Sequence, residues 1–183
     1  MPNPANDARV EATRTIHQGR IFRLEIERVT LPGGHVVDME LIRHPGSVVM
    51  VPQPSPAEIV LISQYRHAIR RWIWEVPAGT LKPNEDPEAA AVRECEEEIG
   101  QVPSTVTHLA TFYPTPGFCD ETMAFYACTD LRPAAPDSTV VKDADEEIEP
   151  RTFTLDEALA MLARGDIVDM KTAIALQMLA ARR

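Results

Sequence analysis

The chain has 183 residues and a formal net charge of −10, with 44% hydrophobic and 25% charged residues. These values are typical of a soluble globular protein, with one domain large enough to bury a real core. The negative balance argues against a nucleic-acid-binding protein, because phosphate backbones are bound by clustered Lys and Arg side chains.

The amino-terminal part is predicted to be a tail followed by an antiparallel β meander. Residues 1–8 are rich in Pro, Asn and Asp, which predicts a disordered tail and not a signal peptide. Residues 9–45 contain three strand-like runs separated by turn signals, at 10–17, 21–31 and 35–43. This meander has little core of its own, so we expect it to pack on the main domain or on a partner chain. No apolar run approaches the ~18 residues of a membrane span, and we expect a cytoplasmic protein without a membrane partner.

Residues 46–183 are predicted to form the main domain. Six segments have the apolar character of strands, and the polar segment 131–147 is predicted to be a mobile loop. Thr154 and Glu157 form a capping box that opens a helix ending at Gly165, and Asp169 caps a last helix. The pattern favours an α/β protein with a mixed sheet between helices, in α/β/α layers. The strand candidates are 47–52, 59–65, 72–76, 107–113, 122–128 and 148–153.

The stretch 79–101 begins as a loop and becomes a helix. Asp86 is a good N-cap, and Pro87 suits the first helical position because its missing N–H needs no partner there. Gly100 is a good left-handed stop after the last turn. We therefore predict a helix from Pro87 to the residue before Gly100.

One side of this helix is acidic. Glu94 and Glu98 are four residues apart and so project from one face, with Glu97 beside them. Such a run is usually a solvated surface. It could equally hold Mg²⁺, which is bound by a few carboxylates together with phosphate oxygens of a substrate. Arg93 can pair with Glu97 one turn on and hold it in place.

The spacing of Gly79, Glu85, Arg93-Glu94, Glu97-Glu98 and Gly100 reads G-x5-E-x7-R-E-U-x-E-E-x-G-U. It resembles the Nudix box of the Nudix hydrolases, with one departure at Gln101, a packing position. The resemblance implies a Nudix fold and metal-dependent hydrolysis of a pyrophosphate bond, with Mg²⁺ as the cofactor and Mn²⁺ as a possible substitute. It also implies a role for each residue of the box. The implied metal ligands are Glu94, Glu97, Glu98 and the carbonyl of Ala78, and the implied catalytic residues are Arg93, Glu97 and Glu98.

Glu85 has two readings within the box. It either forms a structural hydrogen bond to the loop or contributes to the metal and water site. Cys119 is not expected to be a nucleophile, because metal-assisted hydrolysis needs none. The three cysteines include no C-x-x-C pair, so neither a disulfide framework nor a zinc site is indicated.

Further segments resemble those of the ADP-ribose pyrophosphatases. They are 44–46, 64–66, 75–79 and 165–172, and Pro116 follows the box by about fifteen residues, as in that group. The resemblance implies a nucleotide-sugar substrate that is cleaved to a nucleoside monophosphate and a sugar phosphate. It also implies a homodimer in which the meander is exchanged between subunits. The main alternatives are a hydrolase for GDP-mannose or another nucleotide sugar and a non-catalytic Nudix sensor.

The same resemblance suggests substrate contacts. Arg66 would contact the phosphates or the terminal ribose, for which a guanidinium fork is suited; the alternative is a surface arginine in the basic segment 66–71. Glu75 would accept a hydrogen bond from a ribose hydroxyl or a metal-bound water, unless it is only a strand-end charge. Pro116 would belong to the substrate loop.

Two assignments remain least defined by the sequence. The resemblance implies that a glutamate of the acidic stretch 145–149 positions the attacking water, with Glu146 favoured and Glu147 second; the alternative is a solvated loop. Family members clamp the base with aromatic residues of the meander, where only Phe22 is available here. Trp72 and Trp74 share a strand face and could stack a base, although tryptophans at this spacing are more often core.

Overall fold

The computed structural model describes residues 7–136, 138 and 147–183, and these fall into two compact units. Unit 1 comprises Met1–Gly46 with Phe112–Met123, and unit 2 comprises Ser47–Thr111 with Ala124–Arg183. Most of the expected amino-terminal tail lies outside the described residues, which begin at Asp7, shortly before the first strand.

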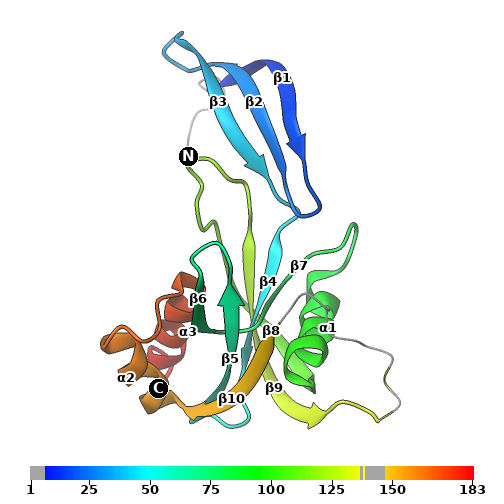
Figure 1. Cartoon of the computed structure of the whole chain (residues 1–183), viewed down its shortest axis with the longest axis vertical. Helices are drawn as coiled ribbons and strands as arrows, with labels where there is room; N and C mark the ends of the chain where they lie inside the picture. The colour runs from blue at the N-terminus through cyan, green and yellow to red at the C-terminus, as the bar shows by residue number, and fades with distance from the viewer. Residues whose placement is uncertain (1–6, 137, 139–146) are drawn as a thin grey trace. The chain divides into compact units, whose positions relative to one another are not determined.

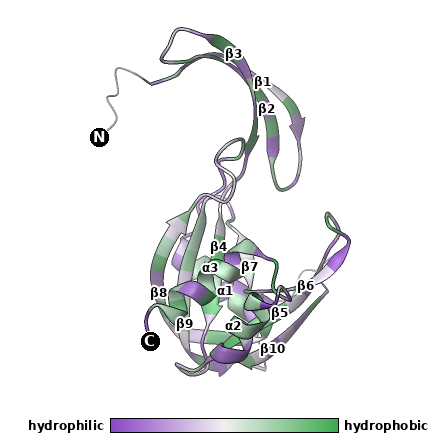
Figure 2. Cartoon of the chain, turned by 90° about the vertical axis from the view of Figure 1, so that its left-hand side faces the viewer, coloured by the Kyte–Doolittle hydropathy of each residue, from purple (hydrophilic) through white to green (hydrophobic). Residues whose placement is uncertain are grey.

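Unit 1 is built on a three-stranded antiparallel sheet in the order β1-β2-β3 (Figure 1). Its strands are β1 (Arg9–Gln18), β2 (Arg23–Thr30) and β3 (Val36–Arg43), close to the three predicted runs. Hydrophilic and hydrophobic residues alternate along these strands (Figure 2), as expected for a sheet with unequal faces. The predicted meander is therefore present.

The second segment of unit 1 is tied to β3 by backbone hydrogen bonds. The amide of Ile42 donates to the carbonyl of Phe118 at 2.7 Å, and the amide of Asp120 donates back to Ile42 at 3.2 Å. Arg43 adds ion pairs to Glu25, Glu27 and Asp120. This loop, which contains Pro116, is therefore anchored to the edge of the meander.

Unit 2 contains two further sheets, with strand orders β10-β5-β6 and β7-β4-β9-β8. Three strands differ from expectation. The stretch 79–101 was predicted to begin as a loop, yet its Gly79 belongs to β7 and pairs with Val48 of β4. The strand β8 begins directly after the preceding helix, and β9 runs into the segment that was predicted to be a loop. The bounds are β4 (Ser47–Pro52), β5 (Glu58–Arg66), β6 (Arg71–Glu75), β7 (Ala78–Thr80), β8 (Gln101–Phe112), β9 (Met123–Pro133) and β10 (Ile148–Thr154).

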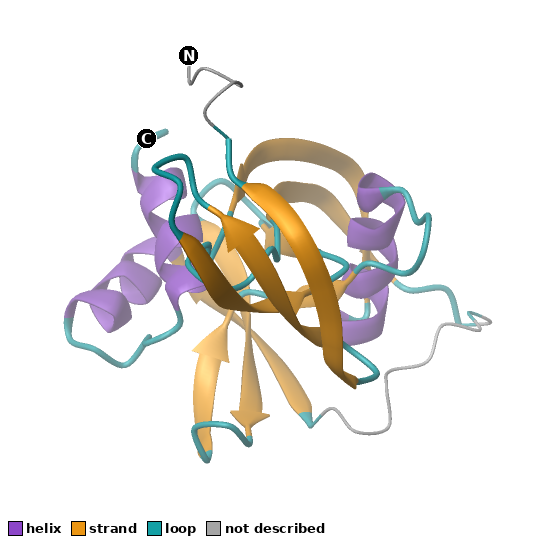
Figure 3. Cartoon of the chain, turned by 90° about the horizontal axis from the view of Figure 1, so that it is seen from above, coloured by secondary structure: helices purple, strands orange, loops and turns teal. Residues whose placement is uncertain are grey.

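In the part of the chain that the structure describes, three helices flank these sheets: α1 (Pro87–Ile99), α2 (Leu155–Ala163) and α3 (Met170–Ala180). Within unit 2, α1 lies on one side of the strands and α2 and α3 on the other (Figures 1 and 3), which gives the predicted α/β/α layers. The predicted N-caps Asp86, Thr154 and Asp169 each accept a hydrogen bond from a first-turn amide. None of the helices in the described ranges is long and apolar enough to cross a membrane.

The core of unit 2 explains why α1 is held so firmly. Every residue of β4 is buried, and Val48 and Met50 meet Ala91 and Cys95 of α1 in one apolar cluster. Fully burying a Val or Met side chain contributes about 1.5–3 kcal/mol. Because one face of α1 is fixed in this way, the side chains on its other face are carried at defined positions.

Candidate active site

The contact between Gly79 and Glu94 places the start of the box against its helix. The pairing of β7 with β4 brings Gly79 onto the inner face of α1. A Cβ atom at this position would lie 1.9 Å from Cδ of Glu94 and 2.1 Å from its Oε1. No real Cβ approaches another heavy atom so closely, so only glycine allows this packing.

Arg93 is the centre of the site. Its Nε and Nη2 donate to the two oxygens of Glu85 at 2.8 and 2.9 Å. Its Nη1 donates to Oε1 of Glu94 and to Oε2 of Glu97, both at 2.7 Å. The predicted pairing of Arg93 with Glu97 is thus present. Glu85 also accepts from the amide of Lys82 at 2.9 Å, which favours the structural reading of this residue.

The acidic side of α1 is not a solvated surface. Glu94 is only 8% exposed and Glu98 only 4%. Burial raises the pKa of Glu94 to about 7, and the neighbouring charge of Glu97 adds to the rise although Arg93 opposes it. Holding several carboxylates so close and so dry costs free energy that a bound cation would recover.

The chemistry of these residues fits a divalent cation. Three carboxylates from one helix, with backbone carbonyls of the adjacent turn, are the oxygen ligands that Mg²⁺ prefers. Among the described residues, no three His, Cys, Asp or Glu side chains surround a common point. Arg93 Nη1 instead contacts both Glu94 and Glu97. The donors are therefore of the right kind, and Arg93 holds two of the carboxylates together.

Arg66 and Glu75 form a second charged group in unit 2. Arg66 Nε and Nη2 donate to the two oxygens of Glu75 at 2.7 and 2.8 Å. Glu75 is 1% exposed, whereas the Arg66 side chain keeps 41% of its surface accessible. The hydrogen bonds to Glu75 raise the pKa of Arg66 against the effect of burial, and the negative charge of Glu98 contributes too. Arg66 therefore lies within electrostatic reach of the acidic helix.

Sequence reasoning gave no role to the residues of α3 that complete this group. Lys171 is buried, contacts Oε2 of Glu75 and lies 3.2 Å from Oδ2 of Asp169. Thr172 Oγ1 accepts from the amide of Val76 at 2.8 Å and donates to Asp169 at 2.6 Å. The resemblance of segment 165–172 to a known group was the one signal that pointed here.

Within the described residues, no hydrogen bond or ion pair joins the remaining predicted site residues to the group around Arg93 or to the group around Glu75. Phe22 and Pro116 belong to unit 1, where both are exposed; the Phe22 ring lies 6.4 Å from that of His17. Glu146 lies outside the described residues, and Glu147 is exposed.

The two tryptophans of β6 differ from each other in burial, and one of them contradicts the prediction that both belong to the core. Trp74 packs edge-on against Phe153 with ring centroids 5.0 Å apart, as expected of a partly buried residue. Trp72 is 51% exposed and lies against Tyr65 of the neighbouring strand. The core reading is therefore wrong for Trp72, because its end of β6 has no covering element among the described residues.

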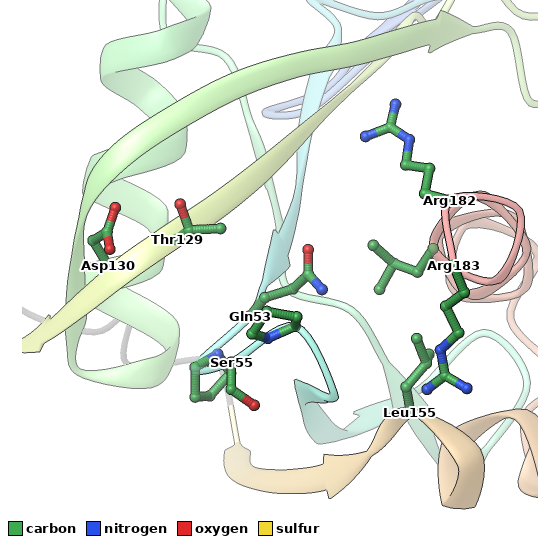
Figure 4. Close-up of a pocket in the computed structure, with 10 residues that line it drawn as sticks. Gln53, Ser55, Thr129, Asp130, Leu155, Arg182 and Arg183 are labelled. Carbon is green, nitrogen blue, oxygen red and sulfur yellow. The ribbon is translucent and has the colours of Figure 1, made fainter.

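A separate hollow of about 470 Å³ lies between the β4–β5 connection, β9 and the ends of α2 and α3 (Figure 4). Two arginines at the end of α3 and one carboxylate of β9 line it together with apolar side chains. It contains none of the predicted site residues. Its labelled lining residues are Gln53, Ser55, Thr129, Asp130, Leu155, Arg182 and Arg183.

Comparison with known proteins agrees with the geometry of the box. The NUDIX domain model matches residues 43–173. A methanol dehydrogenase activator of Bacillus methanolicus is 37% identical, over 91% of this chain and 89% of the relative. An ADP-ribose pyrophosphatase of Bacillus subtilis is 34% identical, over 92% and 90%. A crystal structure of an ADP compounds hydrolase superposes with a TM-score of 0.82 at 19% identity, covering 99% of this chain and 96% of the other, which shows a shared fold.

Proposed function

This chain belongs to the NUDIX family and is a pyrophosphohydrolase, and we propose that its substrate is ADP-ribose or a closely related nucleotide sugar. The products are a nucleoside monophosphate and a sugar phosphate. The single observation that carries the proposal is the electrostatic interaction of Arg66 with Glu98 of the acidic helix. A guanidinium that binds phosphate lies within electrostatic reach of the carboxylates that suit a metal. The ADP-ribose pyrophosphatase relative supports the choice of substrate.

Glu94, Glu97 and Glu98, with the carbonyl of Ala78, are the residues that would hold a divalent cation. Nudix hydrolases generally use such ions, and we propose Mg²⁺, with Mn²⁺ as a substitute. When bound, the cation neutralises charge on the phosphate oxygens and favours attack by water. Arg93 keeps Glu94 and Glu97 together through one nitrogen, so it organises these carboxylates before any ion arrives.

Activation of the water is assigned to Glu146, with Glu147 as the second candidate. The assignment rests on the family resemblance of the acidic segment. A carboxylate close to a cluster of other carboxylates is suited to accept a proton near neutral pH. Glu97 and Glu98 keep their catalytic role as carboxylates of the box.

Recognition of the rest of the substrate is assigned to four further residues. Arg66 contacts the phosphates or the terminal ribose, and Glu75 supports that end of the substrate. Phe22 stacks the base, and Pro116 belongs to the substrate loop. The exposure of Phe22 is consistent with such a role, since 41% of it faces solvent in the single chain.

We also propose a homodimer in which the β1–β3 meander is exchanged between subunits. Several large apolar side chains of this sheet are exposed in the single chain, and a partner subunit would cover them. The exposed residues are Val10, Ile16, Ile21, Phe22, Val36 and Met39. Sedimentation of the full chain and of a variant with charged residues at Val10 and Val36 tests this proposal.

The substrate is tested with a panel of nucleotide sugars in the presence of Mg²⁺. Phosphate released after treatment of the products with phosphatase measures each rate. We expect ADP-ribose to have the highest kcat/KM. A much higher value for GDP-mannose or UDP-glucose would overturn the assignment of the substrate, and chelation of the metal should abolish every rate.

One relative is named an activator of another enzyme, which gives a regulatory role a specific basis. Binding of ADP-ribose by metal-loaded protein without turnover would favour that role. Turnover at an ordinary enzyme rate, about 1 s⁻¹ or more, would favour the hydrolase.

A further inference from the structure

A buried lysine connects α3 to the arginine that faces the site. Lys171 stands in the first turn of α3 and is 6% exposed. Its Nζ contacts Oε2 of Glu75, the same oxygen that accepts from Arg66 Nη2 at 2.8 Å. Three charged side chains from β5, β6 and α3 are thus joined through one carboxylate.

Arg66 and Lys171 together keep Glu75 ionised. Burial alone would raise the pKa of this carboxyl, but Arg66 and Lys171 outweigh burial and hold the pKa below its ordinary value. The charged groups that face Glu75 are Arg66 from β5 and Lys171 from α3, with Asp169 beside Lys171. Without Lys171 a single, partly exposed arginine would have to neutralise a carboxylate that is 1% exposed.

Glu75 in turn fixes the orientation of Arg66. It holds the Nε–Nη2 edge of the guanidinium by two parallel hydrogen bonds, an arrangement that restricts both direction and rotation. The side chain nevertheless remains 41% exposed. Arg66 is therefore immobilised from the protein side and still accessible to a ligand.

The same end of α3 also anchors the strand that carries Glu75. Thr172 accepts a hydrogen bond from the amide of Val76, and Asp169 caps the helix while it pairs with Lys171. Val76 directly follows Glu75 and leads through Pro77 into β7, which carries Gly79 of the box. One helix terminus therefore fixes both the carboxylate and the backbone next to it.

We propose that Lys171 is a positioning residue for substrate phosphate, acting through Glu75 to hold Arg66 in its binding orientation. This inference rests on the proposed role of Arg66. It makes the α3 terminus part of the phosphate-binding apparatus, and it gives Glu75 a supporting role in which its oxygens contact protein cations.

The test compares Lys171→Met with Lys171→Arg, using the affinity of the full-length protein for inorganic pyrophosphate, measured by calorimetry, and KM for ADP-ribose. Lys171→Met should lower the affinity for pyrophosphate and raise KM for ADP-ribose, each by about tenfold or more, because small displacements of a positioning group are costly. It should lower kcat much less, and Lys171→Arg should recover most of the loss. Arg164→Met, which removes an exposed cation after α2, is the matched control and should leave both values unchanged.

Dependence on Arg66 separates positioning from a general structural effect. In the Arg66→Gln background, Lys171→Met should have little further effect, because the group that it positions is already gone. Affinity of Lys171→Met should also fall further as the pH is lowered, since its Glu75 takes up a proton more readily. Additive effects of the two substitutions, or an unchanged pyrophosphate affinity, would overturn the inference.

A second variant covers the case in which Lys171→Met does not fold. The pair Lys171→Met with Glu75→Gln removes both buried charges and should fold, because a neutral pair leaves no buried ion unpaired. The affinity of this double variant for pyrophosphate should remain below that of the wild type. Wild-type affinity of the double variant would overturn the inference. A different result would contradict the proposed function and leave this inference intact. In that case the wild-type protein hydrolyses none of the nucleotide sugars, while its pyrophosphate affinity still depends on Lys171 and Arg66.

Discussion

The two charged clusters of unit 2 differ in their balance of positive and negative side chains. The cluster at α1 contains four carboxylates, those of Glu85, Glu94, Glu97 and Glu98, and one guanidinium, that of Arg93, which contacts the first three. The cluster of Arg66, Glu75, Lys171 and Asp169 balances two cations with two carboxylates. An excess of buried negative charge calls for a cation from solution, whereas a balanced cluster is complete within the protein. The first is therefore suited to chemistry and the second to holding a binding group in place.

The substitution with the largest expected effect on this contrast is Glu98→Gln. The substitution removes one negative charge from the unbalanced cluster, and we expect kcat for ADP-ribose to fall by roughly 1,000-fold, as on removal of other electrostatic groups from active sites. Thermal unfolding should show that the fold is retained. Glu88→Gln, in the exposed first turn of the same helix, is the control and should keep the wild-type rate. A wild-type rate for Glu98→Gln would refute the role of the helix in metal binding.

A second test asks whether the chemistry needs a carboxylate beyond the box. Glu146→Gln should lower kcat by about 100-fold or more, with little change in KM, since general-base catalysis typically contributes that much. The matched variant is Glu147→Gln, which should be nearly neutral. If only Glu147→Gln is impaired, the water is handled by that residue; if neither is, the whole role belongs to α1.

The contrast also explains what could be predicted from the sequence. The helix α1, its caps at Asp86 and Gly100, and the pairing of Arg93 with Glu97 all depend on residues within a few turns, where helical periodicity fixes proximity. The contact of Lys171 with Glu75 joins positions 96 residues apart, which no local pattern encodes. For the same reason the segment of β7 was expected to be a loop, because its strand character comes from pairing with β4.

Burial was the other property that local patterns could not give. A run of acidic residues is usually solvated, yet Glu94 and Glu98 are buried, and Gly79 lies directly against Glu94. Conversely, the spacing of Trp72 and Trp74 indicated core, and Trp72 is half exposed. In each case the outcome depends on which distant segment covers the side chain.

Gly79→Ala tests whether the unbalanced cluster depends on close packing. The new Cβ would meet Glu94 at 1.9 Å, so the carboxylate must leave its place beside Arg93. We expect kcat/KM to fall by about tenfold or more, because a displaced carboxylate is a misplaced metal ligand. Gly33→Ala is the control, since its Cβ would meet only the His35 ring at 3.6 Å. Equal activity of both variants would show that Glu94 can be repositioned freely.

The smallest expected effect concerns the balanced cluster and the pH dependence of stability. Because the pKa of Glu75 in the folded protein lies below the ordinary value of 4.5, the unfolded chain binds the proton more readily as the pH falls below that value. The contribution of Glu75 to stability is thus complete above pH 4.5 and is lost as the pH falls through the folded-state pKa.

Glu75→Gln lacks this contribution, so its Tm should fall less steeply on acidification than that of the wild type. The difference should amount to a few degrees, since 1 kcal/mol moves Tm by roughly 2–4 °C in a domain of this size. Glu40→Gln, at an exposed position of β3, should follow the wild-type curve. Parallel curves for Glu75→Gln and the wild type would mean that Arg66 and Lys171 do not hold Glu75 ionised, and the balanced cluster would then lose its basis.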